Sequence, residues 1–130
     1  MLAAHLTEQQ TQENMLTKPF LEFCNAVNMP VDIESAYINM ANSATVTTEH
    51  MDSSREGMSM LYYPNSYWKL AWGGETLFFD RNQEIAFASI VKPNRAIFFD
   101  PRILHTARPP TVLATSSRYT FVYKSNKKGE

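Results

Sequence analysis

The chain of 130 residues has the usual size of one domain, and 44% hydrophobic with 19% charged residues is a globular composition, not a disordered, fibrous or membrane-spanning one. A formal net charge of −1, with the one dense basic run at Lys124–Lys128, offers no field for nucleic acid, so we expect no nucleic-acid partner. The single cysteine, the lack of a signal-peptide pattern and the lack of a long apolar stretch predict a cytoplasmic protein without a membrane partner.

The first part of the chain predicts helix. Residues 1–16 are rich in polar side chains and predict a helical or flexible arm. Thr17 can cap a helix, and apolar residues then recur at steps of three and four as far as Val27, before Asn28 and Pro30 end the pattern. We therefore expect a short amphipathic helix there.

Beyond Pro30 the sequence consists of short β-like runs separated by turn residues. So many short strands favour a sandwich or barrel, and we predict a mainly β protein with a flanking helix: a double-stranded β-helix, the cupin-like jelly roll, forming one domain over residues 1–130. The expected strands are Ser35–Ala41, Ser43–Thr48, Ser59–Tyr63, Glu75–Phe79, Ile85–Ile90, Arg95–Phe99 and Arg118–Lys124.

Two of the three histidines can belong to a metal site. His50 and Asp52 form an HxD pair after a Thr-rich run, where alternate side chains point to the same side. His105 follows an apolar strand and can complete a set of two histidines and one carboxylate. Such a set occupies one face of an octahedral ion and suits Fe(II) that must also bind a cosubstrate and O2. His5, in the polar arm, is expected to be a solvated surface residue.

Arg118 begins the aromatic strand RYTFVYK and can point into the same barrel. Its planar guanidinium makes two parallel hydrogen bonds to a carboxylate, which suits a dicarboxylate cosubstrate. The alternative is a surface arginine at a strand edge. An HxD pair alone is also weak evidence, because two-residue patterns arise by coincidence.

Six motifs in order carry a family resemblance. They are HMD at 50–52, MLYYPNSYW at 60–68, WGGETLFF at 72–79, KPNRAIFFD at 92–100, ILHTARPP at 103–110 and RYTFVYK at 118–124. Together they resemble the Fe(II)/2-oxoglutarate-dependent dioxygenases, specifically the prolyl 4-hydroxylase-like branch with its phage and marine bacterial members. The resemblance covers about residues 36–124.

The resemblance implies roles for particular residues. His50, Asp52 and His105 would be the catalytic iron ligands. Arg118 would hold the distal carboxylate of 2-oxoglutarate together with Tyr63, while Tyr62 would face the other way. Tyr37 and Asn39 would line the cosubstrate or substrate pocket, although a core role is an alternative for both. The implied cofactors are Fe(II), 2-oxoglutarate and O2, with ascorbate as a candidate accessory reductant.

Other positions in these motifs predict structure or depart from the family. Gly73 and Gly74 predict a tight turn with positive φ. Trp68 and Trp72 could form a wall beside the iron, but packing is the more common role of large aromatics. Asn94 stands where the family has glycine, and asparagine also tolerates the left-handed conformation. The lead before HxD is short for the family, which is consistent with a minimal member, a fragment or a chain completed by a partner.

The resemblance leaves the substrate open. A peptidyl proline in a peptide or protein is the leading prediction, and free amino acids or other small molecules are alternatives. The sequence does not define the oligomeric state. Two other classes of function remain: a catalytically silent jelly roll that binds a ligand or partner, and a non-oxygenase metal enzyme, using zinc or another divalent ion, in which Arg118 binds an anionic substrate.

Overall fold

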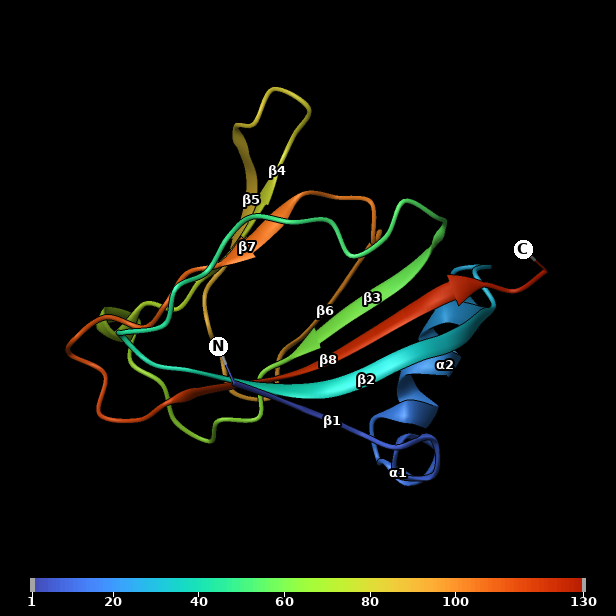
Figure 1. Cartoon of the computed structure of the whole chain (residues 1–130), viewed down its shortest axis with the longest axis horizontal. Helices are drawn as coiled ribbons and strands as arrows, with labels where there is room; N and C mark the ends of the chain where they lie inside the picture. Colours follow the sequence, from blue (N-terminus) through green and yellow to red (C-terminus); the bar gives the residue numbers. More distant parts are fainter. Residues whose placement is uncertain (1, 130) are drawn as a thin grey trace.

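The computed structural model describes residues 2–129, which form two β-sheets with two helices (Figure 1). The larger sheet has the strand order β1-β2-β8-β3-β6, and the smaller has the order β5-β4-β7. All paired strands are antiparallel. The strands are β1 (Leu2–His5), β2 (Val31–Ala41), β3 (Gly57–Tyr62), β4 (Thr76–Phe79), β5 (Ile85–Ser89), β6 (Ala96–Phe99), β7 (His105–Ala107) and β8 (Arg118–Lys127).

Both helices lie on the side of the larger sheet away from the smaller one (Figure 1). Helix α1 (Glu8–Glu13) is short, and α2 (Thr17–Ala26) packs Phe20 and Cys24 against the sheet. A 3-10 helix, η1 (Leu70–Trp72), lies in the long connection before β4. None of the helices in residues 2–129 is long and apolar enough to cross a membrane.

Strand alternation divides the apolar residues into two cores. On the helix side, Tyr123 of β8 and Met60 of β3 pack with Phe20. Between the sheets, Val122 of β8 and Leu61 of β3 belong to a second cluster. Because successive strand residues face opposite sides, one strand can serve both cores. This arrangement is the double-stranded β-helix predicted from the sequence.

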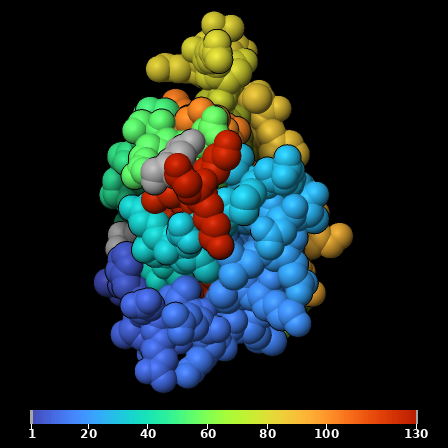
Figure 2. Space-filling view, turned by 90° about the vertical axis from the view of Figure 1, so that its right-hand side faces the viewer, coloured from blue at the N-terminus to red at the C-terminus, as the bar shows by residue number. Residues whose placement is uncertain are grey.

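The hairpin of β4 and β5 projects from the body of the molecule, as both views show (Figures 1 and 2). Phe87 on β5 is 57% exposed there. Asn94 has a φ of 64° and lies in the turn before β6, in agreement with the expectation that asparagine takes a left-handed conformation at this position.

Several predicted elements differ from the structure. The arm contains a strand, β1, which pairs with β2 from Leu2↔Met40 to His5↔Tyr37. The expected strand Ser43–Thr48 is wrong. Asn42 starts a turn there, in which its side chain accepts from the backbone N–H of Ala44, and the segment continues as irregular backbone. Strand β7 was not predicted, because its three residues are too short to show a periodic pattern.

The cap of α2 also differs from the prediction. Leu16, without a side-chain cap, precedes the helix, and Thr17 is its first residue. The Thr17 hydroxyl instead bonds to the Thr11 carbonyl and to the Tyr123 hydroxyl, which lies 2.8 Å away. Thr17 thus ties α2 to β8 instead of capping the helix. The prediction of a single domain over 1–130 includes Met1 and Glu130, which lie outside the described residues, and it stays a prediction.

Candidate active site

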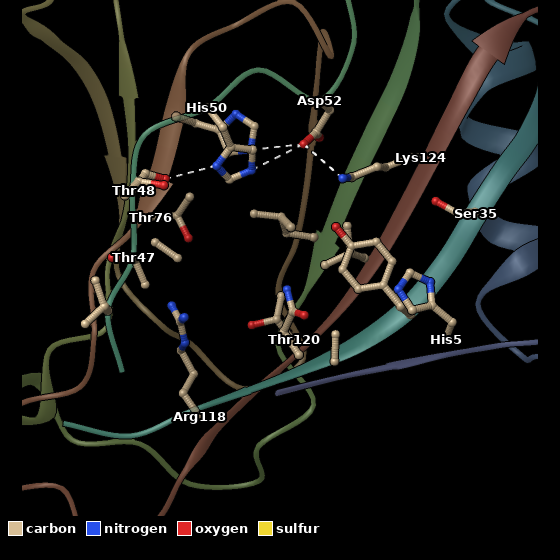
Figure 3. Close-up of a pocket in the computed structure, with 18 residues that line it drawn as sticks. His5, Ser35, Thr47, Thr48, His50, Asp52, Thr76, Arg118, Thr120 and Lys124 are labelled. Carbon is tan, nitrogen blue, oxygen red and sulfur yellow. Dashed lines mark hydrogen bonds and ion pairs between the residues drawn. The ribbon is translucent and has the colours of Figure 1, made fainter. Parts of the chain in front are cut away.

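A cavity of about 460 Å³ lies between the two sheets (Figure 3). Strand β8 supplies its floor, because four alternate side chains of this strand face the same side. These are Arg118, Thr120, Val122 and Lys124. The volume is that of a site for a small organic molecule. Side chains from β1, β2, β3, β4, β7 and the 46–52 segment complete the lining.

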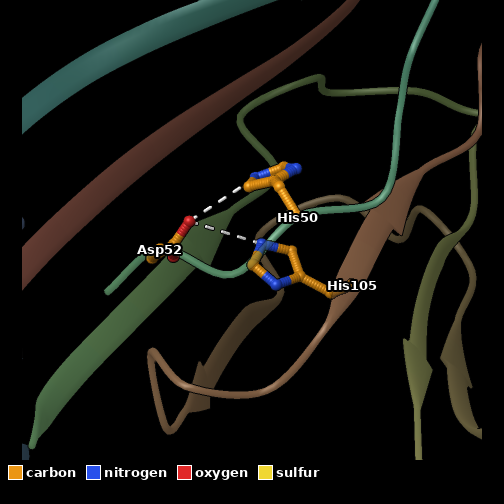
Figure 4. A group of neighbouring side chains, drawn as sticks. All are labelled: His50, Asp52 and His105. Atoms are coloured by element: carbon orange, nitrogen blue, oxygen red, sulfur yellow. Dashed lines mark ion pairs between the residues drawn. The ribbon is translucent and has the colours of Figure 1, made fainter. Parts of the chain in front are cut away.

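His50, Asp52 and His105 converge at one end of this cavity (Figure 4). One donor atom from each lies within 4.8 Å of the others. The Asp52 Oδ1 atom is 3.5 Å from the Nε2 atoms of both His50 and His105. The backbone brings them together, because His50 and His105 exchange two N–H···O hydrogen bonds of 2.9 Å as an isolated bridge. The structure therefore brings together the three predicted ligands.

The hydrogen bonds of both imidazole rings leave their Nε2 atoms pointing at the carboxylate. Nδ1 of His50 lies 3.1 Å from the Thr48 carbonyl, and Nδ1 of His105 lies 2.9 Å from the Ile103 carbonyl. A carbonyl can only accept, so each Nδ1 carries the hydrogen in the neutral ring and Nε2 keeps a free lone pair. This is the tautomer a metal ligand requires.

The pKa values of the three groups follow from burial and from the Asp52 charge. When His50 is protonated, its Nε2–H can donate to Asp52, and this interaction raises the pKa of His50 above 6.5 against the effect of burial. Burial lowers the pKa of His105 despite its bond to Ile103. Burial alone would raise the pKa of Asp52, but hydrogen bonds from His50 and Ser59 outweigh it and lower that pKa. Asp52 is thus held as a carboxylate beside two imidazoles.

Arg118 lies farther along the cavity and is 2% exposed. Its Nη1 donates a 2.7 Å hydrogen bond to the Gly74 carbonyl, and its Nε has no hydrogen-bond partner within residues 2–129. Burial lowers the pKa of Arg118. A buried guanidinium with a free N–H is strongly stabilised by an anion, because an unpaired buried charge is costly. The cavity end around Arg118 therefore fits a carboxylate.

Tyr63 is not among the residues that line the cavity, and its direct contact with 2-oxoglutarate stays a prediction. Its side chain is fully buried, and its hydroxyl lies 2.7 Å from Oγ1 of Thr76. Thr76, at the start of β4, is the residue that lines the cavity. Tyr63 can therefore act on an occupant of the cavity through Thr76, which the sequence analysis had not identified as a site residue. Tyr62 faces away as expected, and its hydroxyl donates to Asn94 at 2.5 Å.

The remaining predicted pocket residues divide into two groups. Tyr37 and Asn39 of β2 both line the cavity. Trp68 and Trp72 do not belong to its lining; they pack edge to face at 5.2 Å, and the Trp68 indole donates to the Gly73 carbonyl. Gly73 has a φ of 65°, so the expected turn with positive φ is present.

His5 and Lys124 also line the cavity, although neither is predicted as a pocket residue from the sequence. His5 is exposed, as expected, but its ring packs 4.9 Å from Tyr37 and it lines the cavity rim (Figure 3). Lys124 places its Nζ 3.6 Å from Asp52 Oδ1. The sequence analysis had placed Lys124 in a terminal basic run, although its even spacing from Arg118 along one strand is a signal for the same face.

Comparison with known proteins supports the same arrangement. A family model described as the 2OG-Fe(II) oxygenase superfamily matches residues 36–123. This match spans all three members of the His50, Asp52 and His105 group as well as Arg118. A search of the curated proteins gave no match.

Three solved structures share the fold at low sequence identity. A viral collagen prolyl hydroxylase from Paramecium bursaria chlorella virus-1 aligns with a TM-score of 0.70 at 14% identity, over 97% of this chain and 75% of that one. A Trichoplax adhaerens prolyl hydroxylase, in complex with a hypoxia inducible factor peptide fragment, aligns with a TM-score of 0.65 at 14% identity, over 97% of this chain and 62% of that one. A Pseudomonas putida prolyl-4-hydroxylase aligns with a TM-score of 0.62 at 15% identity, over 90% of this chain and 69% of that one.

Proposed function

Since the chain belongs to the 2OG-Fe(II) oxygenase superfamily, we propose that it is an Fe(II)- and 2-oxoglutarate-dependent hydroxylase whose substrate is a peptidyl proline. The observation that carries the proposal is the convergence of two imidazoles and one carboxylate, whose donor atoms lie within 4.8 Å of one another at one end of the cavity. The buried Arg118 lines the same cavity at a distance from them.

His50, Asp52 and His105 would hold the iron. Two neutral imidazoles and one carboxylate are the donor set of non-haem Fe(II) oxygenases, and they leave coordination positions free for other ligands. Both Nε2 atoms and Asp52 Oδ1 point toward a common centre, and the Nδ1 atoms are engaged by carbonyls. Ser59, which donates a 2.7 Å hydrogen bond to Asp52 Oδ2, would fix the orientation of the carboxylate.

Arg118 and Thr76 would hold the distal carboxylate of 2-oxoglutarate. Arg118 and Thr76 both line the cavity, the buried Nε of Arg118 has no hydrogen-bond partner within residues 2–129, and Tyr63 supports Thr76 from the core. Asn39 and Tyr37 would line the path between this end and the metal. A buried, fixed guanidinium costs little reorganisation when the dianion enters, which favours tight binding.

The bound iron supplies the chemistry: reductive activation of O2, coupled to oxidative decarboxylation of 2-oxoglutarate to succinate and CO2, with one oxygen atom inserted into a substrate C–H bond. The chain's own contribution is geometric. Its side chains would orient the cosubstrate, and the apolar cluster that includes Leu61, which lines the cavity, and Phe99 would limit access of water from that side.

A peptide is the favoured substrate because the structural relatives include prolyl hydroxylases, one of them bound to a peptide fragment. Strand β1, with Ala3 and His5, lines the cavity on one side, and the irregular 46–48 segment also contributes to the lining. Val46 in that segment is 83% exposed and can contact an apolar side chain of a substrate. Free amino acids remain the alternative small substrates.

The test begins with anaerobic titration of 2-oxoglutarate into Fe(II)-loaded protein, followed in the visible charge-transfer band that chelation produces. Admission of O2 with prolyl peptides should bleach the band and form succinate together with hydroxyproline. Metal binding without the band or succinate would favour the silent module or another metal enzyme. Succinate formed without hydroxyproline would retain the oxygenase and reject proline.

A further inference from the structure

Lys124 is the second cation of the cavity. It lies on the same face of β8 as Arg118, six residues along the strand, a run of about 20 Å between Cα atoms. Its side chain is 26% exposed, and its Nζ lies 5.2 Å from the centre of the Tyr37 ring. Figure 3 shows Lys124 beside Asp52 and Arg118 at the opposite side of the cavity, with Thr120 between them.

The Lys124 ammonium interacts with the Tyr37 hydroxyl as well as with Asp52, and its contact with Asp52 is long. At 3.6 Å the Nζ···Oδ1 distance exceeds that of a hydrogen bond, which is about 2.7 to 3.2 Å. The same Oδ1 lies 3.5 Å from both imidazole Nε2 atoms, so it is the oxygen that faces the metal position. A divalent ion there would compete for this oxygen and repel the ammonium.

With a metal bound, a second anion close to the metal would therefore stabilise the charged Lys124 side chain. Among the residues that line the cavity, Asp52 contributes one negative charge, whereas a divalent ion, Lys124 and Arg118 together contribute four positive charges. Paired charges are much less costly than unpaired ones in a partly buried cavity. A dicarboxylate that spans the cavity supplies one negative group at each end.

We propose that Lys124 binds the carboxylate of the 2-oxo acid end of 2-oxoglutarate beside the metal, while Arg118 binds the distal carboxylate. This assignment rests on the proposed function. It makes the pocket selective for a dianion with a charge at both ends, and it gives Lys124 a role that is separate from that of the three metal ligands.

A pair of ligands can test this division of roles. 2-Oxopentanoate has the same 2-oxo acid end as 2-oxoglutarate but carries a methyl group in place of the distal carboxylate. Affinities of both compounds are measured by calorimetry on Mn(II)-loaded protein, for the wild type and for Lys124→Met, Lys124→Arg and Arg118→Met. Lys127→Met is the matched control, because Lys127 lies on the same strand but pairs with Glu56, and it does not line the cavity.

Lys124→Met should weaken the binding of both compounds by the same factor, about 10- to 100-fold, which is the effect of losing one hydrogen bond to a charged group. Arg118→Met should weaken 2-oxoglutarate by a similar factor and 2-oxopentanoate hardly at all. Lys124→Arg should recover most of the affinity, and Lys127→Met should match the wild type. Thermal unfolding of each variant and a Lys124→Gln variant separate loss of contact from loss of fold.

Three results would overturn the proposal. One is unchanged 2-oxoglutarate affinity in folded Lys124→Met. Another is a loss of affinity in Lys124→Met for 2-oxoglutarate but not for 2-oxopentanoate, which would show that Lys124 binds the distal carboxylate instead. The third is weaker Mn(II) affinity with normal ligand affinity at saturating Mn(II), which would make Lys124 a support for Asp52. If the wild type itself binds no 2-oxoglutarate, the proposed function fails first, and the variants are not needed to show it.

Discussion

The Ser59 hydroxyl donates a 2.7 Å hydrogen bond to Oδ2 of Asp52, which leaves Oδ1 as the atom that faces His50 and His105. Ser59 is fully buried on β3, whereas Asp52 lies on the irregular segment that precedes this strand. The backbone around Asp52 is held by hydrogen bonds from Asp52 N and Ser53 N to the Pro101 carbonyl. The orientation of the Asp52 carboxylate is fixed from the sheet, by Ser59.

Ser59→Ala should lower the Mn(II) affinity about 10-fold, because a hydrogen bond to a metal-binding carboxylate typically contributes that much. Calorimetric titration with Mn(II) measures the effect. Ser125→Ala, which removes another buried hydroxyl, one bonded to the Met58 carbonyl, is the control and should lose stability without losing metal affinity. Equal Mn(II) affinities in Ser59→Ala and the wild type would show that Ser59 does not orient the carboxylate.

Asp52→Asn should abolish Mn(II) binding at micromolar protein, since it removes the only negative charge of the three-ligand group while keeping its shape. Asp32→Asn, at an exposed position of β2, is the matched control and should bind as the wild type does. Retained Mn(II) affinity in a folded Asp52→Asn protein would contradict the assignment of the metal site.

Nuclear magnetic resonance of the metal-free protein can test the two histidine pKa values. His50 should titrate above 6.5, because Asp52 stabilises its charged form, and His105 should titrate below 6.5, because burial opposes its charge. In Asp52→Asn the pKa of His50 should fall. A His50 pKa that is the same with and without the Asp52 charge would show that their hydrogen bond is absent in solution.

These shifts have opposite consequences for stability. The raised pKa of His50 stabilises the metal-free fold below the unfolded pKa, and that contribution is lost as the pH rises through the folded value. The lowered pKa of His105 destabilises the fold as the pH falls below 6.5, because the unfolded chain then binds the proton more readily. In urea unfolding across this range, His105→Gln should lose less stability than the wild type as the pH falls, because only the His105 contribution is removed.

The relation of Tyr63 to Thr76 predicts which hydroxyl contacts the cosubstrate. Thr76→Val should lower the affinity for 2-oxoglutarate about 10-fold and leave the Mn(II) affinity unchanged, because it removes the hydroxyl of a residue that lines the cavity. Tyr63→Phe should mainly lower the free energy of unfolding, by about 1 kcal/mol, the usual net value of one buried hydrogen bond. If Tyr63→Phe loses more affinity than Thr76→Val does, the Tyr63 phenol contacts the cosubstrate directly.

Gly57 at the start of β3 should tolerate no side chain. A Cβ there would lie 2.1 Å from the Ser125 carbonyl oxygen on β8, and backbone of a central strand cannot move away easily. Gly57→Ala should cost at least about 2 kcal/mol in urea unfolding, in the range of other forced overpacking. Gly129→Ala is the comparison, because nothing lies within 4 Å of its Cβ position. Similar losses in both variants would show that the clash is relieved.

Long or strongly patterned elements could be predicted from the sequence, and short ones could not. Helix α2 and strands β2, β3 and β8 carry apolar residues at the helical or strand period. Strand β1 has a polar context and four exposed residues, so only its pairing with β2 defines it. The Thr-rich run at 43–48 has strand propensity but the described structure gives it no strand partner, and tertiary context decides such a case.

For the site, the amino-acid sequence determined the identity and order of the chemical groups. His50, Asp52, His105 and Arg118 were recognisable because donor type and motif spacing are properties of the chain itself. Only the tertiary structure decided which groups face the cavity. It placed Thr76 between Tyr63 and the cavity, and it brought Lys124 close to Asp52, which lies 72 residues earlier in the sequence. Both results depend on strand pairing, because the pairing sets the register of each strand and the face to which each side chain points.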